Sequence, residues 1–195
     1  MKNILQILAA FVILSLSAFV APQASGATFV FDPTQDAIVM DGDIESGDYD
    51  KFLDVVSSHL NDANNLILTS NGGAFIDSLE IGVYVKDAQM NTIASGNCHS
   101  GCAYIWLAGK KLLYDSKADT YISIHMPYSE TWAHFIVQAD KPLVDVVKRY
   151  LKEVAGLKPP AIQEVLDTPG SPDSLLWINQ GRIRGWGLRV LPYGR

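Results

Sequence analysis

Short apolar runs separated by polar turns fill the chain from residue 28 onward, and longer segments with apolar residues three or four positions apart lie between them. This alternation predicts strands and helices in a mixed α/β domain. The predicted strands are 28–31, 37–40, 66–68, 91–95, 111–114 and 121–125. The predicted helices start near Asp48, after Gly72-Gly73 and near Cys98, and three more cover 143–154, the residues after Pro159-Pro160, and 180–186.

Three strand–turn–helix units carry glycine at the turn, at Gly47, at Gly72-Gly73 and at Gly96. Asp48 is predicted to cap the first helix, because Asp is a favoured capping residue. The apolar residues of the second helix are predicted to lie on or near its packed side (Ile76, Leu79, Ile81, Val83 and Val85). Parallel strands joined by helices bind ligands at the carboxyl ends of the strands, so we expect the chemistry at these turns.

The first 27 residues differ from the rest of the chain. Lys2 is the only charged residue before Asp32, and an unbroken apolar run covers 7–14. Small residues, Ser25 and Ala27, stand at positions −3 and −1 of a plausible cleavage point, which is the layout of a signal peptide. The alternative is a retained anchor, because 4–20 is just long enough to span a bilayer. We therefore predict a signal peptide or anchor at 1–27 and one domain at 28–195.

Composition narrows the class of protein further. The chain has 195 residues, of which 48% are hydrophobic, and this apolar content excludes wholesale disorder. The net charge of −6, without a basic run, argues against a nucleic-acid partner. Two cysteines cannot form a four-cysteine zinc site. We therefore predict neither a metal nor a cofactor.

Two turns contain groups that could take part in a reaction. Ser70-Asn71-Gly72-Gly73 frees backbone N–H groups before a helix, which suits an oxyanion, although it could be an ordinary glycine-rich turn. Gly96 to Cys102 places Ser100 at the start of an apolar helix, where serine is either a cap or a nucleophile. His125 ends the strand 121–125, which is predicted to lie beside Ser100, and imidazole suits a base near neutral pH. The alternative is a structural, hydrogen-bonded histidine.

Four segments in this order resemble the Clp protease proteolytic-subunit (ClpP-like) family, and most of all its exported bacterial serine proteases. The segment 68–73 resembles the family's strand and Ser-Pro-Gly-Gly turn, with Asn71 in place of Pro. The strand 92–96 leads into Ser100, His125 follows Ser100 by 25 residues, and 124–127 resembles the family's His-x-Pro segment. The resemblance covers 37–127, with a weaker tail at 173–190.

The resemblance implies a ClpP/crotonase-like fold of repeated β-β-α units and a Ser–His–Asp triad. Ser100 is then the nucleophile, His125 the general base, and the N–H groups of Gly73 and Gly101 form the oxyanion hole. The best candidate for the acid is Asp173, whose flanks depart from the family pattern and which could instead cap a helix or form an Asx turn. Asp167 and Glu164 are fallbacks. Gly101 also departs from the bulkier residue of cytoplasmic members.

Further candidate residues surround the nucleophile. Cys98 and Cys102, four residues apart, could form a disulfide that stiffens the turn, or remain two buried thiols. A cysteine nucleophile and a metal site with His99 are weaker alternatives, because neither spacing supports them. His99 is predicted to be a wall residue or exposed, and Tyr128 and Trp132 to line a groove or pack in the core. The remaining histidines, His59 and His134, are predicted to be surface residues.

The resulting prediction is an exported ClpP-like serine endopeptidase, periplasmic or secreted, that acts on peptides or unfolded proteins. The sequence has no G-x-x-x-x-G-K-S/T motif, so no ATPase of its own is expected. A homo-oligomer is implied by the resemblance, and membrane contact is expected only if the N-terminal segment is retained. The alternatives are a catalytically inactive ClpP-like scaffold or binding protein and a crotonase-type acyl-CoA enzyme.

Overall fold

Strands and helices alternate along most of the chain in the computed structural model, which describes residues 26–60, 62–130 and 136–194. The strands are β1 (Thr28–Asp32), β2 (Ala37–Asp41), β3 (Asn65–Ser70), β4 (Asn91–His99), β5 (Leu112–Asp115), β6 (Tyr121–Ile124), β7 (Tyr128–Glu130), β8 (Ile136–Gln138), β9 (Leu176–Trp177) and β10 (Val190–Tyr193). The helices are α1 (Asp48–Ser57), α2 (Phe75–Asp87), α3 (Gly101–Leu107), α4 (Lys141–Glu153), α5 (Pro159–Leu166) and α6 (Gln180–Trp186).

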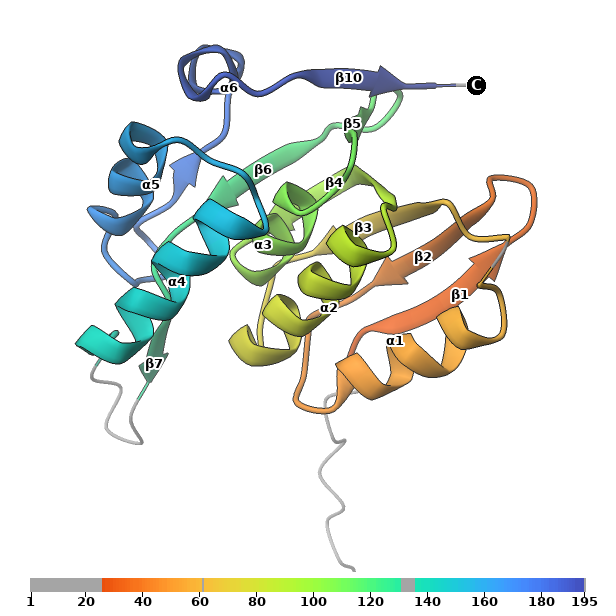
Figure 1. Ribbon diagram of the computed structural model, residues 1–195, viewed down its shortest axis with the longest axis horizontal. Coiled ribbons are helices and arrows are strands. Elements are labelled where there is room, and N and C mark those ends of the chain that lie inside the picture. The colour runs from red at the N-terminus through yellow and green to blue at the C-terminus, as the bar shows by residue number, and fades with distance from the viewer. Residues whose placement is uncertain (1–25, 61, 131–135, 195) are drawn as a thin grey trace, which may run out of the picture.

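Most of these strands form one mixed sheet of eight, in the order β1–β2–β3–β4–β5–β10, with β6 paired to β4 and to β9 (Figure 1). β1 pairs antiparallel with β2, and β9 antiparallel with β6, while the other neighbours are parallel. The predicted single α/β domain with parallel strands joined by helices is therefore confirmed.

The main core lies between this sheet and the helices that cover one of its faces (Figure 1). Alternation along β3 explains how the sheet divides its side chains: Leu66 and Leu68 belong to this core, whereas Ile67 belongs to a smaller cluster with Ile93 on the opposite face. α3 is buried along its whole length, which fits its uninterrupted apolar sequence.

Three local predictions were wrong. The residue that caps α1 is Gly47 (φ 93°), and Asp48 is the first helical residue, with its carboxylate turned to other partners. In α2, Ile76 and Val83 are exposed at 57% and 42%, because only one stripe of the helix can face the sheet. β4 does not end at Gly96 but bends there and continues to His99.

The continuation of β4 decides the shape of the site. Its first half pairs with β5, and its second half, after Gly96, pairs with β6. The change of partner lets β5 and β6 both lie beside the same strand. It also carries residues 97–99 to the edge of the sheet where β6 ends.

Candidate active site

Ser100 and His125 are brought together by the parallel pairing of β4 with β6. His99, the last residue of β4, lies opposite Ser123 in this register. The backbone N–H of Ser100 donates to the carbonyl of Ser123 (2.9 Å), and His125 follows the end of β6 directly. Both residues line one cleft of about 420 Å³. The predicted placement of the histidine on a neighbouring strand, at the same edge as Ser100, is confirmed.

Ser100 lies at a sharp turn between β4 and α3. Its backbone has φ 51° and ψ −118°, a conformation that a non-glycine residue adopts only under strain imposed by its surroundings. Such a turn raises the side chain above the strand and toward the cleft. The amino end of α3 follows immediately, so its unpaired N–H groups lie next to the serine. This local geometry is suited to a nucleophile.

A disulfide joins the two residues that flank this turn. Cys98 in β4 and Cys102 in the first turn of α3 are bonded, with their Cα atoms 5.1 Å apart, and both are fully buried. The bond closes a short loop around Ser100 and ties the strand to the helix. It therefore limits the ways in which the turn can relax.

His125 is held by its own neighbour in the chain. The residue is 5% exposed, and its Nδ1 lies 2.7 Å from the backbone carbonyl of Met126. A carbonyl can only accept a hydrogen bond, so Nδ1 carries the proton and Nε2 keeps its lone pair. Burial lowers the pKa of His125, and the bond to Met126 opposes part of that shift. The ring is therefore neutral at pH 7 and its Nε2 can accept a proton.

A second bond fixes the backbone of His125 to α3, the helix that follows Ser100. The hydroxyl of Tyr104, in α3, donates to the carbonyl of His125 (3.0 Å), and the hydroxyl of Tyr150, in α4, donates to the carbonyl of Tyr104 (2.9 Å). Both tyrosines are buried, and burial raises the pKa of each phenol, so they remain neutral donors. Sequence reasoning missed Tyr104, because it read the apolar helix as core alone.

The predicted acid lies apart from this pair. Asp173 is exposed, and its backbone N–H donates to Ser171 Oγ (3.2 Å). Its neighbours Pro172 and Leu175 line the cleft, but Asp173 does not. The structure therefore brings Ser100 and His125 together and leaves Asp173 outside, while the carbonyl of Met126 occupies the Nδ1 position.

The two fallback carboxylates are engaged elsewhere. Glu164 accepts hydrogen bonds from Trp186 Nε1 (2.7 Å) and from Arg182 Nε (2.6 Å). These bonds hold the pKa of Glu164 below its ordinary value. Asp167 accepts from Gln163 on the surface (2.7 Å). Neither carboxylate lines the cleft of Ser100 and His125.

The turn Asn71-Gly72-Gly73 packs directly against the Ser100 turn. A Cβ on Gly72 would lie 2.7 Å from Ser100 Cβ and 2.9 Å from Gly101 N, and the φ of Gly72 is +102°. Gly73 (φ +131°) lines the cleft, and a Cβ there would collide with the carbonyl of Ile44. Within the described part of the chain, the N–H groups of Gly73 and Gly101 have no hydrogen-bond acceptor. These groups are suitable donors to an oxyanion.

Asn71 is held from outside the cleft. Its backbone N–H and its side-chain Nδ2 both donate to Asp43 Oδ1, at 3.2 and 3.1 Å. A proline at this position has no N–H and could not make the first bond. The ClpP-like turn has Pro where this chain has Asn71. The two bonds from Asn71 to Asp43, on the neighbouring loop, therefore hold the turn in place of the proline.

His99 is a wall residue of the cleft rather than an exposed one. Its Nδ1 lies 2.8 Å from the hydroxyl of Ser123, and its ring meets the ring of Trp177 edge to face. Ser123 is fully buried, so its hydroxyl proton needs an acceptor, and His99 Nδ1 is the one that the described residues offer. Burial, and then repulsion from His125 when that ring is protonated, lower the pKa of His99. His99 is thus a neutral donor through Nε2.

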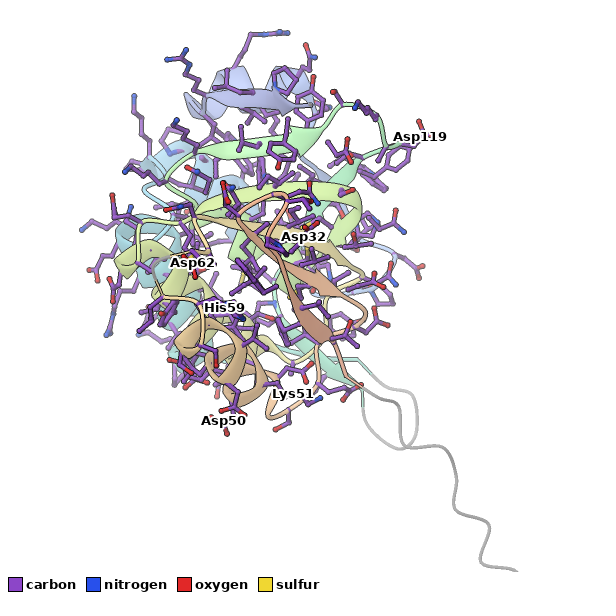
Figure 2. The ribbon with its side chains drawn as sticks, turned by 90° about the vertical axis from the view of Figure 1, so that its right-hand side faces the viewer. Asp32, Asp50, Lys51, His59, Asp62 and Asp119 are labelled. Atoms are coloured by element: carbon purple, nitrogen blue, oxygen red, sulfur yellow. A yellow bond between two sulfur atoms is a disulfide. The ribbon has the colours of Figure 1, made fainter. Side chains whose placement is uncertain are left out.

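The remaining predictions fall elsewhere. Tyr128 lines the cleft, and His59 stacks on Phe31 (ring centroids 4.0 Å apart) at the surface visible in Figure 2. Trp132 and His134 lie outside the described residues. Within the described ranges, no group of three or more metal-ligating side chains gathers, and no helix has the length and apolar character needed to cross a bilayer.

The mixed sheet and its covering helices match the fold of ClpP-like solved structures, which defines the class of fold. No family model and no curated protein matches the chain. Among solved structures, ClpP1 from Listeria monocytogenes, in a mutant form, is similar with a TM-score of 0.59 and 16% identity, over 80% of this chain and 91% of that one.

Two structures of the membrane-bound stomatin-specific protease 1510-N are also similar. The serine-to-alanine mutant has a TM-score of 0.58 and 18% identity, over 78% of this chain and 76% of that one. The lysine-to-alanine mutant, in complex with a substrate peptide, has a TM-score of 0.56 and 16% identity, over 78% and 72%. At these identities the comparisons show the fold alone.

Proposed function

We propose that this chain is an exported ClpP-like serine endopeptidase. The observation that carries the proposal is the strained turn of Ser100, which lines the same cleft as a buried, neutral His125. A strained serine and an imidazole with a free nitrogen, both lining one cleft, are the groups that nucleophilic catalysis requires. The similar structures come from proteases, which supports the same class of reaction.

In the proposed reaction, Ser100 Oγ attacks the carbonyl carbon of a peptide bond while His125 Nε2 takes the hydroxyl proton. The negative charge that develops on the carbonyl oxygen is held by the N–H groups of Gly73 and Gly101. His125 then gives the proton to the leaving amine, and the C–N bond breaks to leave an acyl group on Ser100. Water, activated by the same imidazole, releases the acyl group as a carboxylate and restores the serine.

The orientation of His125 is assigned to the carbonyl of Met126, which holds Nδ1 in the protonated form. A triad with Asp173 remains a prediction, because it requires that carboxylate to replace the carbonyl at Nδ1. Asp173 then needs to move with residues 171–175, whose described contacts are local. In this proposal Ser100 and His125 are sufficient for measurable hydrolysis, and Asp173 has a smaller role.

The compartment and partners follow from other features. A disulfide persists in oxidising compartments, which agrees with a leader at 1–27 and a periplasmic or secreted location. The sequence has no nucleotide-binding P-loop motif, so the proposal contains no ATP-driven step. Extended segments of peptides or unfolded proteins are the proposed substrates, bound in a cleft walled by Phe75 and Tyr128. Assembly into a homo-oligomer is part of the same proposal.

A fluorophosphonate probe tests the nucleophile. We expect the purified protein to be labelled, Ser100→Ala to lose the label, and the exposed control Ser129→Ala to keep it. The kcat/KM for a fluorogenic peptide should fall by at least about 10⁴-fold in Ser100→Ala. Labelling that persists in Ser100→Ala would contradict the assignment.

A catalytically inactive ClpP-like scaffold is the second candidate, and the exposure of Asp173 favours it, because the usual third residue is not at the histidine. The same experiment separates the two functions. A folded wild-type protein that is neither labelled nor active on peptides would support the scaffold and reject the hydrolase.

A further inference from the structure

The backbone at residues 26 and 27 is buried against an acidic side chain. Ala27 is 2% exposed, and its backbone N–H donates to Asp48 Oδ2 (2.8 Å). Asp48 itself is 0% exposed, although it lies at the start of a surface helix. A buried carboxylate at this place is unexpected, because the desolvation of a charge is costly unless it is compensated.

The partners of Asp48 among the described residues include a single cation, which lies largely in solvent. Oδ2 accepts a second backbone bond from Glu45 N (2.8 Å), and Oδ1 pairs with Lys51 Nζ (2.7 Å). The side chain of Lys51 is 54% exposed and projects from the amino end of α1 with Asp50 (Figure 2). Solvent therefore screens the cation that the described residues place beside this carboxylate. A second positive charge on the buried side would stabilise it far more.

Gly26 occupies the position from which such a charge could come. A Cβ on Gly26 would lie 2.6 Å from both carboxylate oxygens of Asp48 and 2.8 Å from Glu45 Cβ. Gly26 is thus pressed against the carboxylate so closely that a side chain does not fit there. If Gly26 were removed, its space would be open to the additional hydrogens of a free amino group on Ala27.

We propose that the peptide bond between Gly26 and Ala27 is hydrolysed and that the freed α-ammonium of Ala27 pairs with the buried carboxylate of Asp48. Water supplies the oxygen that turns the Gly26 carbonyl into a carboxylate on the released piece, and the nitrogen of Ala27 becomes an ammonium group. A leader peptidase acting in trans catalyses this step. The proposal does not depend on whether the cleft of Ser100 is catalytic.

This site lies one residue before the point predicted from the sequence pattern. The pattern Ser25-x-Ala27 places the cut after Ala27, whereas Ala24-x-Gly26 provides equally small residues at −3 and −1 for a cut before it. A cut after Ala27 would remove a residue of the main core and one donor to Asp48. A cut before Ala27 keeps the core residue and its donor to Asp48, and it adds the positive charge of a free α-ammonium group. The packing therefore favours Ala27 as the first residue.

The new ion pair would also steady one wall of the cleft. Asp48 holds the backbone of Glu45, and the adjacent Ile44 donates to the carbonyl of Gly72 and accepts from Ala74 N, both at 2.7 Å. The turn at Gly72 and Gly73 is thus linked to Ala27 through a single short loop. Processing would order this turn in addition to fixing the end of the chain.

Two measurements test the proposal. First, the full chain is exported from a bacterial host and the intact mass of the mature protein is determined, with Ala27 expected as the first residue. Second, chains that begin at Gly26, Ala27 and Thr28 are released from a cleavable fusion and their Tm values are compared. We expect the chain that begins at Ala27 to have the highest Tm, by about 10 °C.

The role of Asp48 is tested by combining each start with a substitution. In Asp48→Asn, the difference in Tm between the starts at Ala27 and Gly26 should vanish, whereas in the exposed control Asp50→Asn it should persist. If Asp48→Asn does not fold, labelling of the α-amine of the native Ala27 chain replaces it, and we expect labelling at least about tenfold slower than in the unfolded chain. Maturation at another residue, equal Tm values, or unprotected labelling would overturn the proposal.

Discussion

The two sides of the cleft are held in different ways. On the serine and histidine side, a backbone bond joins Ser100 to Ser123, a buried hydroxyl joins Tyr104 to His125, and a disulfide closes the turn. On the opposite side, the described bonds of residues 171–174 are local, such as those of Asp173 and Ser174 to Ser171. The candidate nucleophile and base are therefore bonded to buried elements, whereas the candidate acid is part of the surface.

The largest difference between the two sides should be seen in activity. We expect His125→Gln to lower kcat/KM for a peptide by about 10³-fold or more, because the proposed general base is lost. Asp173→Asn should lower it by less than about tenfold, because the carbonyl of Met126 already holds Nδ1. Steady-state kinetics with one fluorogenic peptide measure both.

The same two variants can also contradict the small role that is expected for Asp173. Replacing a carboxylate that engages the histidine of a triad costs about 10⁴-fold in kcat. A loss of that size in Asp173→Asn, with an unchanged Tm, would mean that residues 171–175 close onto His125 when substrate binds. Equal, small losses in both variants would remove His125 from the mechanism.

The contact between the two glycine turns gives the second prediction. Gly72→Ala must place a methyl group against Ser100 and Gly101 at a positive φ, so we expect the free energy of unfolding to fall by about 3 kcal/mol, with activity reduced. Gly156→Ala is the matched control, because its φ is +68° with open space around it, and it should cost about 1 kcal/mol. Urea denaturation measures both, and similar losses would mean that the turns do not pack as described.

Several parts of this arrangement could be predicted from local sequence. Apolar spacing placed the helices, including the segment 180–186, and the Gly72-Gly73 turn placed the end of β3. The position of His125 beside Ser100 also followed, because parallel strands end at one edge of a sheet. These features depend on patterns of neighbouring residues, which the sequence displays directly.

Other parts depend on tertiary partners that have no local signal. The carbonyl of Met126 is a backbone group, so the sequence could not mark it as the partner of His125. Asp48 stands where a helix cap is expected, yet its carboxylate turns to Ala27, more than 20 residues earlier. The bend at Gly96 extends β4 toward a second partner, although glycine usually signals a strand end.

The disulfide supplies the third prediction. Its loop is short, so replacing both residues, in Cys98→Ala/Cys102→Ala, should lower the free energy of unfolding by about 2 kcal/mol. Because both residues are buried, the variant is more informative than a reducing agent, which must first reach the bond. We expect kcat to fall more than the affinity for peptide, since the turn at Ser100 is loosened. Unchanged stability and kcat would show that the backbone bonds alone hold the turn.

The dependence on pH should give the smallest effect. Burial lowers the pKa of His125 and of His99 below the ordinary value of 6.5, so the unfolded chain binds more protons than the folded one in the interval below 6.5. The free energy of unfolding should therefore be highest above pH 6.5 and decrease as the pH falls through that interval, while kcat/KM decreases as His125 is protonated.

Replacing His99 separates its contribution to the pH dependence of stability from that of His125. We expect His99→Gln to reduce the loss of stability between pH 7.5 and 5 by less than about 1 kcal/mol, because solvent screens this partly exposed ring. The pH profile of kcat/KM should keep its shape, since the proposed base, His125, is unchanged. Urea midpoints and peptide hydrolysis at matched pH values measure the two quantities. A stability slope identical to that of the wild type would mean that His99 is protonated as readily in the folded protein as in the unfolded chain.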